Sequence, residues 1–251
     1  MSTTHPTLDP DEHVARALPW PIWLGLPLAI GIAPSVTRAF SEDAYMRYFR
    51  RETGIVEITT ALILAAAFVT GISLLRRARE YPAGWLKLWF GAFTLGCLYF
   101  LGEEISWGQH FFGWSTPEVL AESNDQSETN LHNLGGWMGV LLDQLPRTLL
   151  TIAAVVGGLI GPLVLRARRR GWDPQSDFRP WIWPLRIAIP AALGAVTISL
   201  PKKFFDEGVP AWLDFQAGES KEAFLAALLL VYALGVRASC LGRDARAGAA
   251  A

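Results

Sequence analysis

The stretch IVEITTALILAAAFVTGISLL, Ile55–Leu75, decides the fold class, because Glu57 is the only charged residue in it. A helix that crosses a bilayer needs roughly 20 mostly apolar residues, and this run has that length. Its apolar residues are continuous rather than alternating, which favours a helix over a strand of a membrane barrel. We therefore expect this segment to form a membrane-spanning helix.

Five more apolar runs resemble this one, and 51% of the 251 residues are hydrophobic. This share is larger than a soluble core of this size requires. The expected spans are Trp20–Val36, Ile55–Leu75, Trp85–Leu101, Leu149–Leu165, Ile182–Leu200 and Phe224–Val236. The sequence thus predicts an all-α fold, a polytopic transmembrane helix bundle of about six spans.

A shorter apolar stretch, Leu134–Leu145, precedes the fourth span and ends at Pro146, which breaks or kinks a helix. It is too short to cross alone, so we expect a short interfacial or re-entrant helix; the alternative is the top of a long kinked span. The transmembrane domain is expected to cover residues 19–237. Residues 1–18 would form a mobile N-terminal tail and residues 238–251 a disordered C-terminal tail.

The basic residues predict an orientation in the membrane. They flank the second and third spans and follow the fourth and sixth, at Arg76, Arg77, Arg79, Lys87, Arg166, Arg168, Arg169, Arg170, Arg237, Arg243 and Arg246. Such clusters favour the cytoplasmic side, so both termini are predicted to be cytoplasmic, in a bacterial inner membrane. The connection 102–146 contains neither lysine nor arginine and would then face outward.

The charge of the chain limits its partners. A net charge of −1 leaves no long basic face, so we expect no nucleic-acid partner. The expected partner is the lipid bilayer, and the oligomeric state stays open. One group of arginines departs from the predicted orientation and is interleaved with acidic residues, which we interpret as its partners: Arg38, Arg47, Arg50 and Arg51, beside Glu42, Asp43 and Glu52.

The third span runs directly into a polar motif, GEEISWGQH, residues 102–110. If the helix continues, Glu103, Trp107 and His110 fall on one face, at spacings of four and three residues. Glu104 lies about 100° around the helix from Glu103. Two adjacent carboxylates at a membrane boundary repel each other, which favours a proton-sharing site or a general base.

A second polar motif, SETNLHN, follows at residues 127–133. If Ser127 caps a helix there, Glu128 and His132 lie one turn apart on the same face. Together the two motifs predict an outward-facing Glu/His site at the end of the bundle. Its candidate residues are Glu103, Glu104, His110, Glu128 and His132, with Trp107, Gln109, Asn130 and Asn133 as polar neighbours.

Two interpretations of this site remain open. Imidazole and carboxylate ligands suit zinc, iron or manganese, so His110, His132 and Glu128 are candidate ligands of a divalent metal. Alternatively, Glu128 is a first-turn acid on a helix dipole, and the histidines form hydrogen bonds at the membrane interface. Glu57 is the most clearly intramembrane acid; it either joins the site or pairs with Arg50 or Arg51.

Two resemblances rest on these motifs. The segments GEEISWGQ and ETNLHN resemble those of an uncharacterised family of bacterial multi-pass membrane proteins, which implies no particular activity. The Glu103-Glu104 pair near an aromatic residue is also similar to the glutamate motif of the CAAX-protease and bacteriocin-processing intramembrane peptidases, in which paired glutamates activate water. The chain departs from that motif at Gly108, where the peptidases have arginine. Their second motif, Phe with His four residues later, is missing, and their third, His with Asn four residues later, is also missing because Gly136 stands four residues after His132.

Three hypotheses of function follow. The first is a membrane-embedded hydrolase of a lipid or membrane peptide, with Glu103 or Glu104 as general base and Glu128 and His132 completing the catalytic site. The second is a proton- or cation-coupled transporter or channel, whose path Glu57, Glu103 and Asp143 would line. The third is a non-catalytic subunit of a membrane complex.

Overall fold

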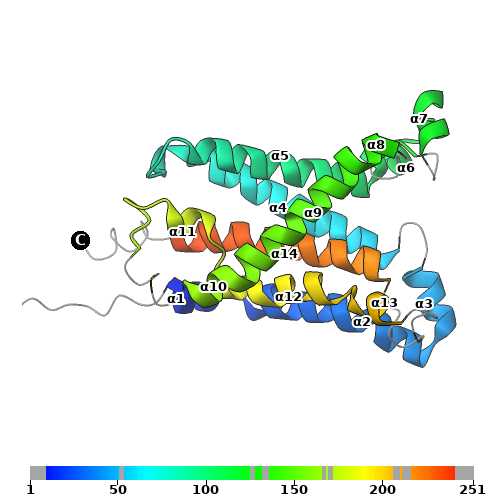
Figure 1. Cartoon of the computed structure of the whole chain (residues 1–251), viewed down its shortest axis with the longest axis horizontal. Helices are drawn as coiled ribbons and strands as arrows, with labels where there is room; N and C mark the ends of the chain where they lie inside the picture. The colour runs from blue at the N-terminus through cyan, green and yellow to red at the C-terminus, as the bar shows by residue number, and fades with distance from the viewer. Residues whose placement is uncertain are drawn as a thin grey trace, which may run out of the picture.

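The computed structural model describes residues 10–50, 54–124, 128–131, 136–165, 168, 172–205, 210 and 216–240. Within these residues the regular elements are helices, which confirms the predicted all-α class (Figure 1). The α-helices are α1 (Pro10–Ala17), α2 (Leu26–Phe40), α3 (Glu42–Tyr48), α4 (Ile55–Arg76), α5 (Leu86–Glu104), α6 (Gln109–Phe112), α7 (Glu118–Ser123), α8 (Gly136–Gly139), α9 (Leu145–Ala153), α10 (Gly161–Val164), α11 (Arg179–Ile182), α12 (Ile189–Thr197), α13 (Leu200–Phe204) and α14 (Ala217–Cys240).

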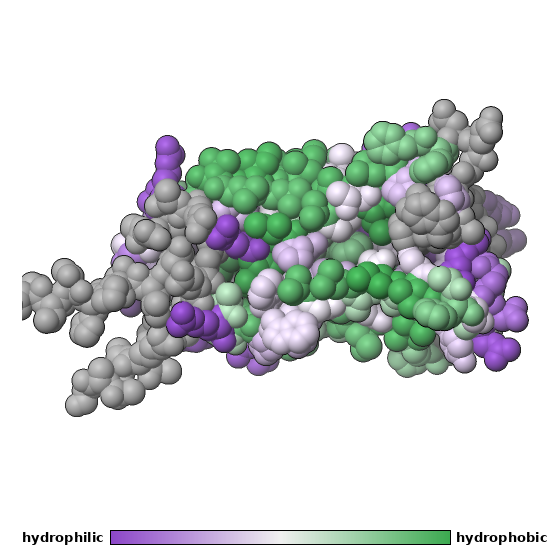
Figure 2. Space-filling view, turned by 90° about the horizontal axis from the view of Figure 1, so that it is seen from below, coloured by the Kyte–Doolittle hydropathy of each residue, from purple (hydrophilic) through white to green (hydrophobic). Residues whose placement is uncertain are grey.

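Five helical segments in the described part of the chain are long and apolar enough to cross a membrane. They are Pro21–Phe40, Ile55–Arg76, Gly136–Val164, Arg179–Phe204 and Ala217–Cys240. Figure 2 shows the matching surface, a broad hydrophobic band between more hydrophilic residues near the two ends of the bundle. The chain is therefore a multi-pass helix bundle with the surface of a membrane protein.

The sixth expected span, Trp85–Leu101, forms α5, which packs along α4. Helix α5 is 19 residues long but is not one of the five apolar segments, and it contains Lys87, Glu103 and Glu104. A sixth crossing therefore stays a prediction. What the structure shows is that α5 brings its two glutamates to the end of the bundle where α4 and α14 begin (Figure 1).

The segment Gly136–Val164 is one continuous helix of 29 residues that runs diagonally across the bundle in Figure 1. It consists of α8, α9 and α10, joined by π-helical stretches at Val140–Gln144 and Ala154–Ile160. The expected short interfacial or re-entrant helix is therefore wrong, and the alternative of one long span is correct. Pro146 fits because it lies in the first turn of α9, directly after a π-helical stretch that has already altered the hydrogen-bond register.

The two ends of the chain are more ordered than expected. Residues 10–17, predicted to belong to a mobile tail, form α1, and Val14 and Leu18 are buried in the core. The tail prediction is therefore wrong for this part, and residues 1–9 lie outside the described part. Residues 238–240 still belong to α14, and 241–251 are not described. Helix α1 and the last turn of α14 lie at the same end of the bundle (Figure 1).

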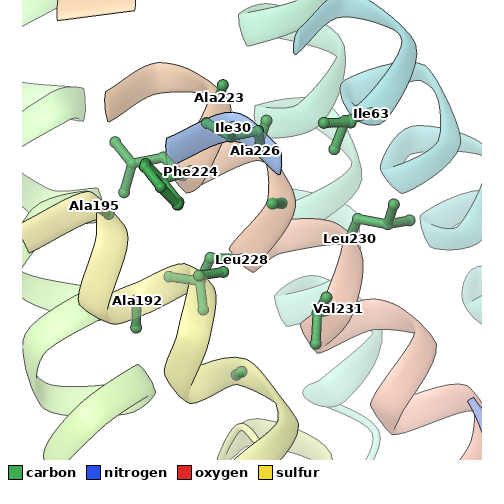
Figure 3. Close-up of a cluster of buried hydrophobic side chains, with 14 of the residues drawn as sticks. Ile30, Ile63, Ala192, Ala195, Ala223, Phe224, Ala226, Leu228, Leu230 and Val231 are labelled. Atoms are coloured by element: carbon green, nitrogen blue, oxygen red, sulfur yellow. The ribbon is translucent and has the colours of Figure 1, made fainter. Parts of the chain in front are cut away.

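Helix α14 forms the centre of the bundle, where it contacts α1, α2, α4, α11 and α12. Its core-facing side is rich in small residues, including Ala223, Ala226 and Ala227, all nearly inaccessible to solvent. Figure 3 shows this helix beside Ala192 and Ala195 of α12. Helices in lipid gain little from burying apolar surface against one another, so small residues that permit close approach supply the packing.

The closest approach within this core is between Gly194 of α12 and the Phe224 ring of α14. A Cβ atom added at Gly194 would lie 2.1 Å from that ring. The ring also touches α2, because a Cβ atom at Gly31 would lie 3.4 Å from it. Phe224 thus fills a space that exists only because Gly194 has no side chain.

We predict that Gly194→Ala lowers the free energy of unfolding by about 1–3 kcal/mol, the usual effect of overpacking a rigid core. The matched control is Gly91→Ala in α5, where an added Cβ atom meets no heavy atom within 4 Å. Because alanine is the better helix former, the control should keep or raise stability. Thermal unfolding of both variants in detergent measures the difference, and equal midpoints would contradict this packing.

Candidate functional site

The C-terminal end of α5 positions both glutamates of the first motif. The helix ends at Glu104, and the next residues turn sharply, with positive φ angles at Ser106 (45°) and Trp107 (54°). The expected continuation of the helix through His110 is therefore wrong. The Trp107 indole folds back over Gly102, where an added Cβ atom would lie 2.8 Å from the ring.

Glu103 is held by two donors at this turn. Its side chain is almost fully buried, and its Oε1 accepts a hydrogen bond from Trp107 Nε1 at 2.7 Å. Its Oε2 accepts one from the backbone N–H of Leu131 at 2.6 Å. The sequence correctly predicted that Glu103 and Trp107 lie together, but the predicted reason, a shared helical face, is wrong. A tight turn after α5 brings the two side chains into contact.

Residues 128–131, which we call the strap, lie against this turn. Glu128 Oε2 accepts hydrogen bonds from Ser106 Oγ and, at 2.7 Å, from Asn130 Nδ2. Asn130 is fully buried, and it also accepts from Asn124 Nδ2 at 2.8 Å. The strap is not helical, so the helix expected to place Glu128 one turn from His132 does not form over residues 128–131, and His132 itself lies outside the described residues.

Gln109 adds a third point of attachment to the strap. Its Oε1 accepts a hydrogen bond from the backbone N–H of Thr129 at 2.7 Å, and its Nε2 donates to Thr116 Oγ1 at 2.9 Å. The two polar motifs of the sequence thus bind each other across the end of α5. The two motifs share a set of buried and partly buried hydrogen bonds, which fix the connection in one position.

The metal prediction is not decided by these contacts. His132, Asn133 and Arg51 lie outside the described residues, and nothing is described of the His110 side chain. Glu128 is therefore the one expected ligand whose side chain is described. Within the described part of the chain, no group of three or more His, Cys, Asp or Glu side chains is placed to hold a metal ion.

Glu104 points to a different set of partners from Glu103. Its carboxyl group lies at hydrogen-bonding distance from the carboxyl group of Glu222 on α14. A hydrogen bond between two carboxyl groups requires a proton on one of them. Glu57 of α4 and Glu219 of α14 also lie near enough to act on Glu104 electrostatically.

Arg147 supplies the positive charge beside this pair. It forms ion pairs with Asp143, one turn earlier on its own helix, and with Glu222. We call Glu104, Asp143, Arg147 and Glu222 the carboxyl cluster. It joins three segments distant in sequence, α5, the Gly136–Val164 helix and α14.

A small cavity of about 20 Å³ lies within the carboxyl cluster, enough for about one water molecule. Its lining also includes Tyr99, whose hydroxyl donates a hydrogen bond to the Leu142 carbonyl at 2.7 Å. A polar cavity of this size beside the two carboxyl groups provides room for one water molecule that hydrogen-bonds to them.

Sequence reasoning missed part of this cluster. Glu222 lies beyond the first turn of α14, which begins at Ala217, so it pairs with Arg147 rather than serving only the helix terminus. The sequence feature that could have indicated this cluster is Arg147, a lone cation four residues after Asp143 inside a long apolar stretch. Glu57 lies near Glu104 as expected of a site member, and its pairing with Arg50 or Arg51 stays a prediction.

Comparison of the chain with family models, with curated proteins and with solved structures finds no match.

We predict that Asn130→Ala loosens the strap, because it removes the donor to Glu128 and Ser106 and the side-chain acceptor of Asn124. The local opening free energy should fall by about 1–3 kcal/mol. Hydrogen–deuterium exchange of residues 128–131 should then accelerate about tenfold or more. The control Ser115→Ala changes an exposed position of the same connection, and equal exchange in both variants would contradict the assignment.

Proposed function

We propose that this protein is a multi-pass inner-membrane protein that translocates protons, with the Glu104–Glu222 pair as its proton-binding site. The close approach of these two carboxyl groups, which line one small cavity beside Arg147, is the observation that supports the proposal. Ionisable groups at membrane depth are rare, and carboxyl chains are a recurrent means of moving protons there.

The charge balance of the carboxyl cluster explains how a proton is held and released. With one proton shared, Arg147 neutralises one of the remaining negative charges. Loss of the shared proton adds a negative charge next to Asp143 without another cation among the four side chains. Rebinding of a proton from water is therefore favoured, while Arg147 prevents the proton from being held too tightly.

The hydrolase hypothesis has less support from this geometry. Paired-glutamate hydrolysis needs both carboxylates directed at one water, but Glu103 is occupied by Trp107 and Leu131. Glu104 instead contacts Glu222. The two adjacent residues thus hold different partners, as expected for consecutive positions of a helix.

Proton flux into proteoliposomes tests the proposal. Vesicles that contain the full chain and a trapped pH-sensitive dye should dissipate an imposed pH gradient faster than empty vesicles. Glu104→Gln and Glu222→Gln should each reduce this flux about tenfold or more, equivalent to a barrier about 1.4 kcal/mol higher.

The matched control is Glu118→Gln, which changes an exposed glutamate of α7 and should leave the flux unchanged. The measurement is repeated with opposed sodium and potassium gradients, so that coupled exchange is also detected. Wild-type flux equal to that of empty vesicles under all these gradients would rule out proton translocation.

The orientation included in the proposal has its own test. Both described ends of the chain lie at one end of the bundle, and the strap lies at the other (Figure 1). A fluorescent protein fused after residue 251 should therefore fluoresce, and alkaline phosphatase should be inactive at the same point. Phosphatase inserted at exposed Glu118 should be active. The reverse pattern would place the strap in the cytoplasm.

A further inference from the structure

The last turn of α5 carries two adjacent glutamates, Glu103 and Glu104, whose carboxyl groups contact different partners. Glu103 accepts hydrogen bonds from Trp107 and from the strap residue Leu131. Glu104, the next residue and the last of the helix, contacts Glu222. Because one helical turn carries both side chains, a shift of that turn moves both contacts together.

The junction after α5 would not hold this turn in place by itself. Ser106 and Trp107 adopt left-handed φ angles that side chains other than glycine rarely adopt. Helix ends also fray, because their last carbonyl groups lack helical partners. The hydrogen bonds of Glu103 and of Ser106 to the strap oppose both tendencies.

We propose that Glu103 is a positioning residue that links the strap to the proton-binding pair, through its bonds to Trp107 Nε1 and the Leu131 N–H. The strap closed on α5 holds Glu104 against Glu222. The strap released from α5 lets the last turn relax and separates the two carboxyl groups. Only the consequence for flux rests on the proposed function; the coupling itself does not.

Thermodynamic coupling of this kind is reciprocal, which makes it measurable without flux. If closure of the strap favours the Glu104–Glu222 contact, loss of that contact must favour opening of the strap. The groups that act on Glu104 are Glu57 of α4, Glu219 and Glu222 of α14, and Arg147 of the Gly136–Val164 helix, and Asp143 lines the same cavity. Variants of Glu222 therefore change one partner of Glu104 from another helix, far from the strap in sequence.

A cysteine at strap position 129 reports the opening. Thr129→Cys is made in a chain with Cys97→Ala and Cys240→Ala, which removes both native thiols. In liposomes, the rate of modification by a soluble maleimide should increase about fivefold or more in the Glu222→Ala chain, which has no side-chain group to contact Glu104; fivefold is the lower end of typical coupling between sites. It should increase similarly in the Trp107→Phe chain, which loses the donor to Glu103 but keeps a ring over Gly102.

The matched control is Trp137→Phe, an exposed tryptophan of α8, which should leave the rate unchanged. An unchanged rate in Glu222→Ala, with a faster rate in Trp107→Phe, would overturn the coupling while leaving the strap as a structural element. Unchanged rates in both variants would overturn the role of Glu103 as well.

A pH profile of flux separates positioning from a merely structural role. In Trp107→Phe, the pH of half-maximal flux should move to more acidic values, because the separated carboxyl groups bind the shared proton less well. Glu103→Gln, which keeps one acceptor, should move it less. A Trp107→Phe chain with lower flux but an unchanged profile would contradict positioning, whereas absence of wild-type flux would contradict only the proposed function.

Discussion

Arg147 and its two acidic partners form the contact on which the polar interior of this bundle depends. A charged group away from water is tolerated only when other charges or dipoles replace the lost hydration. Arg147 meets this requirement through Asp143 on its own helix and Glu222 on α14. The ion pair with Glu222 thereby fixes the position of the long Gly136–Val164 helix along the central helix α14.

The remaining features of the site follow from the ion pair between Arg147 and Glu222. Glu222, fixed by Arg147, presents its carboxyl group to Glu104, and a proton between the two groups would remove their mutual repulsion. Glu104 in turn ends α5, where a left-handed turn folds Trp107 back over Gly102 and onto Glu103. The strap completes the arrangement by satisfying the second oxygen of Glu103. Charge neutralisation, helix termination and loop attachment are thus consecutive consequences of one buried polar network.

Much of the fold could be predicted from the sequence, because long apolar runs permit few alternatives to helices in a bilayer. Pro146 misled the prediction of a separate short helix, since a π-helical stretch accommodates it inside one long span. The candidate residues Glu103, Glu104, Trp107, Gln109, Glu128 and Asn130 do gather at one end of the bundle. Their division into strap contacts and proton-binding contacts could not be predicted, because it depends on where α5 ends and on Glu222, which is distant in sequence.

The infrared spectrum of the purified full-length protein in lipid tests the central claim most directly, since a protonated carboxylic acid has a carbonyl stretching band distinct from that of a carboxylate. At neutral pH the wild-type chain should show this band, and both Glu104→Gln and Glu222→Gln should lose or shift it, while Glu118→Gln retains it. Absence of the band from the wild-type chain, or its unchanged presence in both variants, would show that Glu104 and Glu222 do not share a proton.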